Sequence, residues 1–210
     1  MRLTVFGATG GIGQEIVRQA LAAGHQVTAV VRDPSKLPVT GQRLEVLAAS
    51  LTEPEQVRKA VAGRDAVLSG LGARSMKDAG ITHRLTRLVL AAMEAEEVRR
   101  LVVVSAAPVG PPPANQPLVD RVIGAGVSAV LRKIYDDLRV MEADLLRSGT
   151  DWTSVRPPKL VDAPLTGTYR TVVGGTPRSG RKIARSDVAH AMLAALDDPA
   201  TVRQGVGVAY

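Results

Sequence analysis

The chain has 210 residues, of which 45% are hydrophobic, 22% charged and 2% aromatic, and its formal net charge is +7. This length and balance fit one globular domain and exclude a chain that is disordered throughout. Cysteine is absent, which excludes disulfides, thiolate catalysis and cysteine-ligated zinc. The three histidines are scattered along the chain, so we expect no bound metal.

The positive charge does not point to a nucleic acid, because the basic residues are spread along the chain without a run of five or more. Few aromatic side chains are present for base stacking. No stretch approaches the roughly 18 apolar residues that span a bilayer, and the apolar run before Gly7 is too short for a secretory leader. We therefore expect a cytoplasmic protein with neither a nucleic-acid partner nor a membrane partner.

Strand-like and helix-like spacings of apolar residues alternate along the chain. A first strand is expected at 2–6, followed by a glycine-rich turn, a helix at 11–23 and a second strand at 26–31. These elements form one βαβ unit. Further strands are expected at 43–48, 65–69, 100–105 and 152–155, and further helices at 52–62, 80–96, 129–148 and 186–196.

Two helix starts and the C-terminal part complete the pattern. Thr52-Glu53-Pro54-Glu55 has the pattern of a capping box, and Ser186-Asp187 is expected to cap the last helix. One or two short strands are expected near 168–184 and a last one at 207–209. Strands that alternate with helices predict parallel pairing with right-handed crossovers. The predicted fold class is α/β, a Rossmann-type doubly wound parallel sheet with helices on both faces, in a single domain over 1–210.

The glycines of the first turn indicate a phosphate-binding site. Gly7, Gly10 and Gly13 are spaced as G-x-x-G-x-x-G between the first strand and the first helix. A pyrophosphate needs main-chain N–H groups at close range and is stabilised by the positive end of a helix. Side chains at the closest positions would hold it away, and the third glycine lets the helix pack near the strand. We expect the amides at 9–13 to bind a dinucleotide; the alternative is a tight turn without a ligand.

The end of the second strand indicates which dinucleotide binds. NAD sites place Asp or Glu there to bind the ribose 2′-hydroxyl, whereas this chain has Arg32, with Lys36 four residues later. A 2′-phosphate carries about two negative charges, which a guanidinium binds and a carboxylate repels. The pattern favours NADP(H) over NAD(H). In the alternative interpretation, Arg32 and Lys36 are solvated charges and Asp33 binds the ribose.

The turn at 6–13, with the sequence FGATGGIG, resembles that of the atypical short-chain dehydrogenase/reductase proteins, in the NAD(P)H-binding, NmrA-like group. Within this group the chain is most similar to the flavin reductase and biliverdin-IXβ reductase branch. The resemblance implies a monomeric NADPH-dependent reductase with an open pocket for planar conjugated acceptors such as flavins and linear tetrapyrroles. It extends nearly end to end and includes residues 30–33, 61–67, 71–74, 163–169 and 183–188.

The resemblance also implies which residues bind the cofactor. In the turn that begins at Gly7 and includes Gly11, the pyrophosphate would be held by Thr9, Gly10, Ile12 and Gly13. The 2′-phosphate would be held by Arg32 and Lys36, and the adenine flanked by Ser50 and Leu51. The cofactor path would be lined by Leu71, Gly72 and Arg74. The nicotinamide would lie by Ser105, and its carboxamide would be bordered by Pro157, Pro158, Lys159 and Leu160. Residues 157–185 and the 106–117 loop are expected to shape the substrate side.

Three residues are candidates for catalysis. Ser105 ends a buried strand, where its hydroxyl could orient the nicotinamide or bind an acceptor carbonyl; alternatively it satisfies its own strand end. Lys159 could stabilise negative charge on the acceptor or bind its carboxylate; alternatively it is a solvated loop lysine. Tyr135 begins the pattern Tyr135-x-x-x-Arg139, whereas the main short-chain dehydrogenase branch has Tyr-x-x-x-Lys; alternatively it is a packing residue.

Two functions are consistent with the sequence. The first is an NADPH-dependent reductase that transfers hydride to a flavin, a linear tetrapyrrole, a quinone or a related ketone, and acts as a monomer or weak homodimer. It suits a chain without a clear acid–base pair, because the cofactor supplies the hydride and the protein supplies orientation and a dry pocket. The second is a non-catalytic NADP(H)-binding sensor of the NmrA-like type, which the missing Tyr-x-x-x-Lys motivates.

Overall fold

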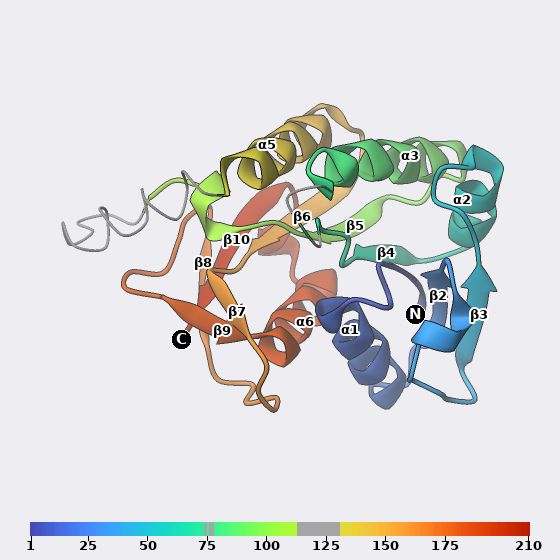
Figure 1. The fold of residues 1–210 in the computed structure, drawn as a ribbon, viewed down its shortest axis with the longest axis horizontal. Coiled ribbons are helices and arrows are strands. Elements are labelled where there is room, and N and C mark those ends of the chain that lie inside the picture. Colours follow the sequence, from blue (N-terminus) through green and yellow to red (C-terminus); the bar gives the residue numbers. More distant parts are fainter. Residues whose placement is uncertain (74, 76–77, 113–130) are drawn as a thin grey trace.

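The computed structural model describes residues 1–73, 75, 78–112 and 131–210. Eight strands of this part form one sheet (Figure 1). Seven of them run parallel, and the last is antiparallel to its neighbour. Across the sheet the strands are β3 (Leu44–Ala48), β2 (Gln26–Val31), β1 (Arg2–Phe6), β4 (Ala66–Ser69), β5 (Arg100–Val104), β6 (Asp151–Arg156), β10 (Gln204–Ala209) and β8 (Arg170–Val173).

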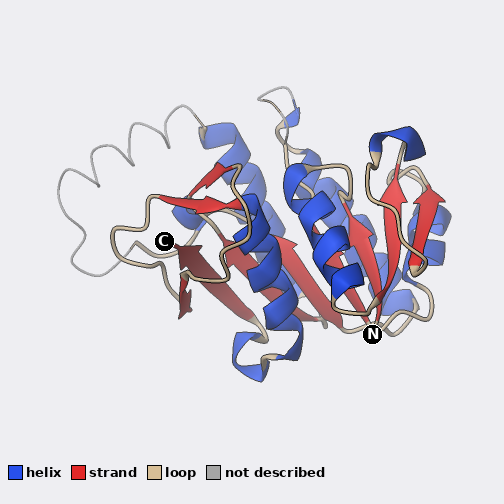
Figure 2. Cartoon of the chain, turned by 90° about the horizontal axis from the view of Figure 1, so that it is seen from below, coloured by secondary structure: helices blue, strands red, loops and turns tan. Residues whose placement is uncertain are grey.

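Helices cover both faces of this sheet. One face carries α2 (Pro54–Val61), α3 (Ile81–Ala95) and α5 (Arg132–Arg147), and the other carries α1 (Gly11–Ala22) and α6 (Arg185–Ala194) (Figure 1). Figure 2, seen from below, shows the second pair in front of the strands. The predicted fold class, a Rossmann-type doubly wound sheet with helices on both faces, is confirmed.

The strand order places the carboxyl ends of the parallel strands along one edge. From β1 the chain first adds β2 and β3 on one side, and then returns to add β4, β5 and β6 on the other. Doubly wound sheets bind their ligands at the point where this order reverses, beyond the carboxyl ends of the strands. In this protein that point lies between β1 and β4.

Each helical layer encloses its own apolar core. The helical spacing of Ile12, Ile16 and Ala20 buries one side of α1 in the cluster that lies beneath α1 and α6. The second cluster lies beneath α2, α3 and α5 and contains Trp152 of β6. These two cores fix the strand ends on which the candidate site is built.

The predicted helix caps are wrong in both cases. The second helix begins at Pro54 after Glu53, which makes no side-chain cap, while the Thr52 hydroxyl lies 2.7 Å from the Ser50 hydroxyl. The last helix begins at Arg185, one residue before the predicted cap. Here Asp187 accepts hydrogen bonds from loop 163–169 and from the Tyr210 hydroxyl instead. The partner of Thr52 is thus local but is not the helix, whereas the partners of Asp187 are distant in the sequence.

The C-terminal part is more extended than predicted. Strand β10 spans six residues, whereas a last strand was expected only at 207–209. The region 168–184 contributes β8 to the main sheet and β9 (Lys182–Ala184) to a separate two-stranded sheet with β7 (Lys159–Val161). Of the helix predicted at 129–148, residues 129–130 lie outside the described part.

Candidate cofactor site

The glycine turn joins β1 to α1 and leaves main-chain amides without helical partners. Gly10 is the N-cap of α1, and the first helical hydrogen bond runs from Gln14 N to Gly10 O at 2.9 Å. The amides of residues 11–13 precede that bond, so they have no acceptor within the helix. Unpaired amides at the positive end of a helix suit a phosphate group.

Close packing explains two of the glycines. Gly7 has φ +70°, a left-handed conformation, and a Cβ on it would lie 2.7 Å from the carbonyl carbon of Gly70. A Cβ on Gly13 would lie only 2.1 Å from Gly7 O, so the start of α1 is pressed against the turn. The third glycine therefore has the packing role predicted for it. Since Gly70 follows β4, these contacts also hold the turn against the switch point of the sheet.

Of the charged residues that follow β2, Asp33 and Lys36 have partners within the chain, whereas Arg32 has none among the described residues. The Asp33 carboxylate accepts hydrogen bonds from Ser35 N at 3.1 Å and Ser35 Oγ at 2.7 Å, and Lys36 Nζ lies 3.5 Å from it. These contacts, with the Ser35 hydroxyl first, lower the pKa of Asp33. Arg32 is exposed and makes no hydrogen bond or ion pair with another described residue. The acid is thus engaged in its own turn, while the guanidinium is available to a ligand.

The residues predicted to flank the adenine lie beside β2. Ala49 N donates to Val31 O at 2.9 Å, which places the segment after β3 next to the end of β2. Ser50 N donates to Gln56 Oε1 at 2.7 Å, and Leu51 packs against the second core cluster. The structure therefore brings Ser50 and Leu51 to the same sheet edge as Arg32.

The segment after β4 runs next to the glycine turn. A Cβ on Gly7 would lie 2.8 Å from Leu71 N, and a Cβ on Gly72 would meet no atom within 4 Å. Open space at Gly72 fits a residue beside a ligand path. Arg74, predicted to line the same path, lies outside the described residues.

Ser105 directly follows β5, and its side chain is buried. Its main-chain N donates to Val155 O at 2.7 Å, but its Oγ has no hydrogen-bond partner among the described residues. The alternative interpretation, in which the hydroxyl satisfies its own strand end, is therefore not what the structure shows. A buried hydroxyl without a partner costs about 1–3 kcal/mol, so a ligand that bonds to it would gain stability.

The surroundings of the other two candidates, Tyr135 and Lys159, do not favour a catalytic role. Tyr135 is 8% exposed and belongs to the second core cluster, and burial raises its pKa. Arg139 pairs with Asp136 at 2.7 Å, so the contacts favour the packing interpretation of Tyr135. Lys159 is exposed at the start of β7, as a solvated lysine would be.

The two segments expected to shape the substrate side contact each other. Ala107 N donates to Pro157 O at 2.9 Å, and Thr176 Oγ1 donates to Pro111 O at 3.0 Å. Pro157 is buried, Pro158 is half-buried and Leu160 packs against the first core cluster. Residues 113–117 of the predicted loop lie outside the described part.

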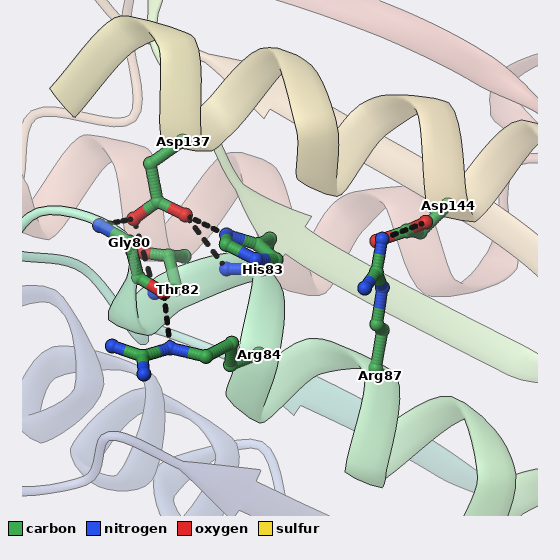
Figure 3. Close-up of polar contacts among 7 residues, drawn as sticks. All are labelled: Gly80, Thr82, His83, Arg84, Arg87, Asp137 and Asp144. Atoms are coloured by element: carbon green, nitrogen blue, oxygen red, sulfur yellow. Dashed lines mark hydrogen bonds and ion pairs between the residues drawn. The ribbon is translucent and has the colours of Figure 1, made fainter. Parts of the chain in front are cut away.

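An interhelical cap at the start of α3 was not predicted. Asp137 of α5 accepts hydrogen bonds from Gly80 N and Thr82 N at 3.0 Å, His83 N at 2.9 Å and His83 Nδ1 at 2.7 Å (Figure 3). Burial would raise the pKa of Asp137, but the hydrogen bonds from His83 and Thr82 lower it overall. The carboxylate fixes the start of α3, and with it the end of the segment that contains Leu71 and Gly72.

A shallow hollow of about 400 Å³ lies at the opposite edge of the sheet. Its lining comes from the residues at or before the starts of β1, β2, β3 and β4, among them Met1, Gly24, Arg43 and Asp65. Ligands of doubly wound sheets bind beyond the carboxyl ends of the strands. This hollow is therefore not part of the candidate cofactor site.

The turn, the free amides and the strand order define a Rossmann-type nucleotide-binding protein. A family model described as NAD(P)H-binding matches residues 7–199, so the chain belongs to the NAD(P)H-binding family. The family membership expected from the sequence is thereby confirmed. Within the described residues, no helix is long and apolar enough to cross a membrane, and no three His, Cys, Asp or Glu residues cluster as metal ligands would.

One curated relative is a 3-diazoavenalumate denitrifying reductase from a Streptomyces species, which is 34% identical over 173 residues. The match covers 71% of this chain and 56% of the relative, so the chain spans about half of that protein's length.

Solved structures share the whole fold. A candidate exported protein from Burkholderia pseudomallei is 28% identical, with a TM-score of 0.83 and 100% coverage of both chains. A short-chain dehydrogenase/reductase from Veillonella parvula in complex with NADP is 20% identical, with a TM-score of 0.84 and coverage of 100% and 94%. A candidate NADH-flavin reductase from Streptococcus pneumoniae is 21% identical, with a TM-score of 0.78 and coverage of 100% and 99%. At the level of fold, the predicted likeness to short-chain dehydrogenase/reductases is confirmed.

Proposed function

We propose that the protein is an NADPH-dependent reductase that transfers hydride to a planar conjugated acceptor: a flavin, a linear tetrapyrrole, a quinone or a related ketone. The observation that carries this proposal is the buried Ser105 hydroxyl, which has no partner among the described residues and lies at the same sheet edge as the glycine turn. The name of the Streptomyces relative, a reductase, supports the reaction class.

The choice of NADPH rests on Arg32. A guanidinium without a partner in the described chain can bind a 2′-phosphate through two hydrogen bonds. The neighbouring Asp33, which would bind a ribose hydroxyl in an NAD site, is already engaged by Ser35 and Lys36. This arrangement supports NADP(H) as the preferred cofactor.

In this reaction the chain's own residues bind the cofactor and orient the reacting groups. When bound, the reduced nicotinamide supplies a hydride to the acceptor. The glycine turn holds the pyrophosphate, and the Ser105 hydroxyl orients the carboxamide or the acceptor carbonyl. A flavin or a quinone can take its proton from water, so a buried Tyr135 that serves as a packing residue does not prevent the reaction.

Stopped-flow measurement of nicotinamide absorbance tests the proposal. The purified protein is mixed with NADPH or NADH and with FMN, biliverdin or a benzoquinone. We expect turnover of at least one acceptor, faster with NADPH, and a loss of about tenfold or more in Ser105→Ala with NADPH binding retained. Ser148→Ala, beyond the end of α5, is the matched control. Tight NADPH binding without turnover of any acceptor would contradict the proposal.

A second candidate function, a non-catalytic NADP(H) sensor, is favoured by the burial of Tyr135 in the second core cluster. A sensor needs no acid–base group, but it needs a partner protein that distinguishes the two redox states. Pull-down experiments with NADPH and with NADP⁺ test this function. Recovery of the same proteins in both states would argue against it.

A further inference from the structure

A second arginine lies over the glycine turn. Arg185 is the first residue of α6 and follows β9 directly. A Cβ built on Gly11 would lie 2.6 Å from Arg185 Cδ and 3.1 Å from its Nε. The stem of this arginine therefore occupies the space that a side chain at position 11 would fill.

The position of Arg185 is set by the packing of α6 against α1. Gln19 Nε2 of α1 donates to Ser186 O at 2.9 Å, which ties the two helix segments together next to the arginine. Arg185 Nη1 donates to Asp162 Oδ1 at 2.6 Å. The Asp162 side chain is 90% exposed, and an ion pair with so exposed a partner is weak. An anion of higher charge can therefore displace Asp162 from the guanidinium.

We propose that Arg185 is a further cofactor-binding residue, which binds the pyrophosphate held by the amides at 11–13. This inference rests on the proposed dinucleotide binding and deepens it. The helical amides contribute partial charges, whereas a guanidinium contributes a full one and two parallel donors for phosphate oxygens. In this chain Gly11 is a glycine because it admits the stem of Arg185.

The proposal assigns different tasks to Arg32 and Arg185. Arg32 follows β2, where the adenosine ribose binds, and should distinguish NADP⁺ from NAD⁺. Arg185 contacts the turn residue Gly11, and the pyrophosphate that this turn binds is common to both dinucleotides. Removal of the Arg185 charge should therefore weaken both to the same extent and leave their ratio unchanged.

Calorimetric titration of the full chain with NADP⁺, NAD⁺ and ADP-ribose tests this assignment. We expect Arg185→Gln to weaken all three about tenfold, the loss typical of one charge-assisted hydrogen bond. Gly11→Ala should weaken binding in the wild type, because it displaces the arginine stem, but much less in Arg185→Gln. Arg43→Gln, at the opposite sheet edge, should bind as the wild type does. Thermal melting of each variant establishes that it is folded.

Four outcomes would overturn the inference or its basis. Unchanged affinity in a folded Arg185→Gln would overturn it, as would equal losses from Gly11→Ala in both backgrounds. A loss for NADP⁺ without a loss for NAD⁺ would assign Arg185 to the 2′-phosphate instead. If the wild type binds neither dinucleotide, the proposed function fails and the inference fails with it, whereas normal wild-type binding with an unaffected variant refutes Arg185 alone.

Discussion

Replacement of Asp137 by alanine should show whether this carboxylate caps the start of α3 or only forms an ordinary surface ion pair. This carboxylate is 1% exposed and accepts four hydrogen bonds, three of them from main-chain N–H groups at the start of α3. The same two helices are also joined by Asp144, which binds Arg87 at 2.7 and 3.1 Å (Figure 3). The chain thus provides a matched pair of interhelical carboxylates: the partners of Asp137 are buried or half-buried, whereas the partner of Asp144 is exposed.

The expected loss in Asp137→Ala is about 3 kcal/mol. Loss of a helix N-cap costs about 0.5–2 kcal/mol, and a buried donor left without an acceptor costs about 1–3 kcal/mol. These costs do not add fully, because water can reach His83, whose side chain is 22% exposed, once the carboxylate is gone. For a chain of this size, the loss lowers Tm by roughly 6–12 °C. Asp144→Ala should cost much less, because Arg87 is 55% exposed.

Urea unfolding followed by circular dichroism measures both losses. The folded pKa of Asp137 lies below its ordinary value of 3.8. Its contribution to the free energy of unfolding is therefore complete above about pH 4 and is lost as the pH falls through the folded pKa. The difference between the wild type and Asp137→Ala should shrink in that acid range. If Asp137→Ala is no less stable than Asp144→Ala at neutral pH, the assignment of Asp137 as the cap of α3 is refuted.

Three further predictions concern the candidate site and the C-terminal part. Arg32→Ala should weaken NADP⁺ binding about tenfold and leave NAD⁺ unchanged by calorimetry, and equal losses for both would argue against its role. Ser105→Ala should leave the free energy of unfolding unchanged or raise it by about 1 kcal/mol, because it removes a buried hydroxyl without a described partner; a clear loss in urea would contradict this. Burial, followed by the Asp187 charge, raises the pKa of Tyr169 from 10.0 to about 12, so its contribution to stability is present below pH 10 and lost between 10 and 12. Tyr169→Phe should abolish that alkaline loss in melts at pH 9–12.

The sequence predicted those elements whose causes are local. The βαβ unit was found because a strand, a glycine turn and an amphipathic helix follow one another within 31 residues. The two predicted caps failed because the hydroxyl of Thr52 and the carboxylate of Asp187 have other partners, and the partners of Asp187 lie 20–23 residues away. No pattern within 168–184 could show that β8 pairs with β10 at the sheet edge.

The residues of the candidate site also divide into those that the local sequence predicts and those that it does not. Arg32 follows one predicted strand and Ser105 ends another, so parallel strand order alone brings them to one edge. Asp137 has partners 54–57 residues away, and a single helical sequence carries no signal for such a contact. Tyr135 shows the converse case, because its spacing to Arg139 suggested catalysis, whereas the tertiary contacts of both residues favour packing.

The glycine turn shows why such a motif predicts a site more reliably than it predicts the task of each residue. In the pattern all of its glycines look alike, but their surroundings differ: a Cβ on Gly7 or Gly13 would lie less than 3 Å from backbone atoms, whereas a Cβ on Gly10 would meet its nearest atom at 3.3 Å. Gly11 is crowded by a side chain that enters from α6, some 170 residues later in the sequence. A chain with a larger residue at position 11 would have to place its arginine elsewhere. The identity of residue 11 is therefore coupled to residue 185, and the test of that coupling is the double substitution rather than either change alone.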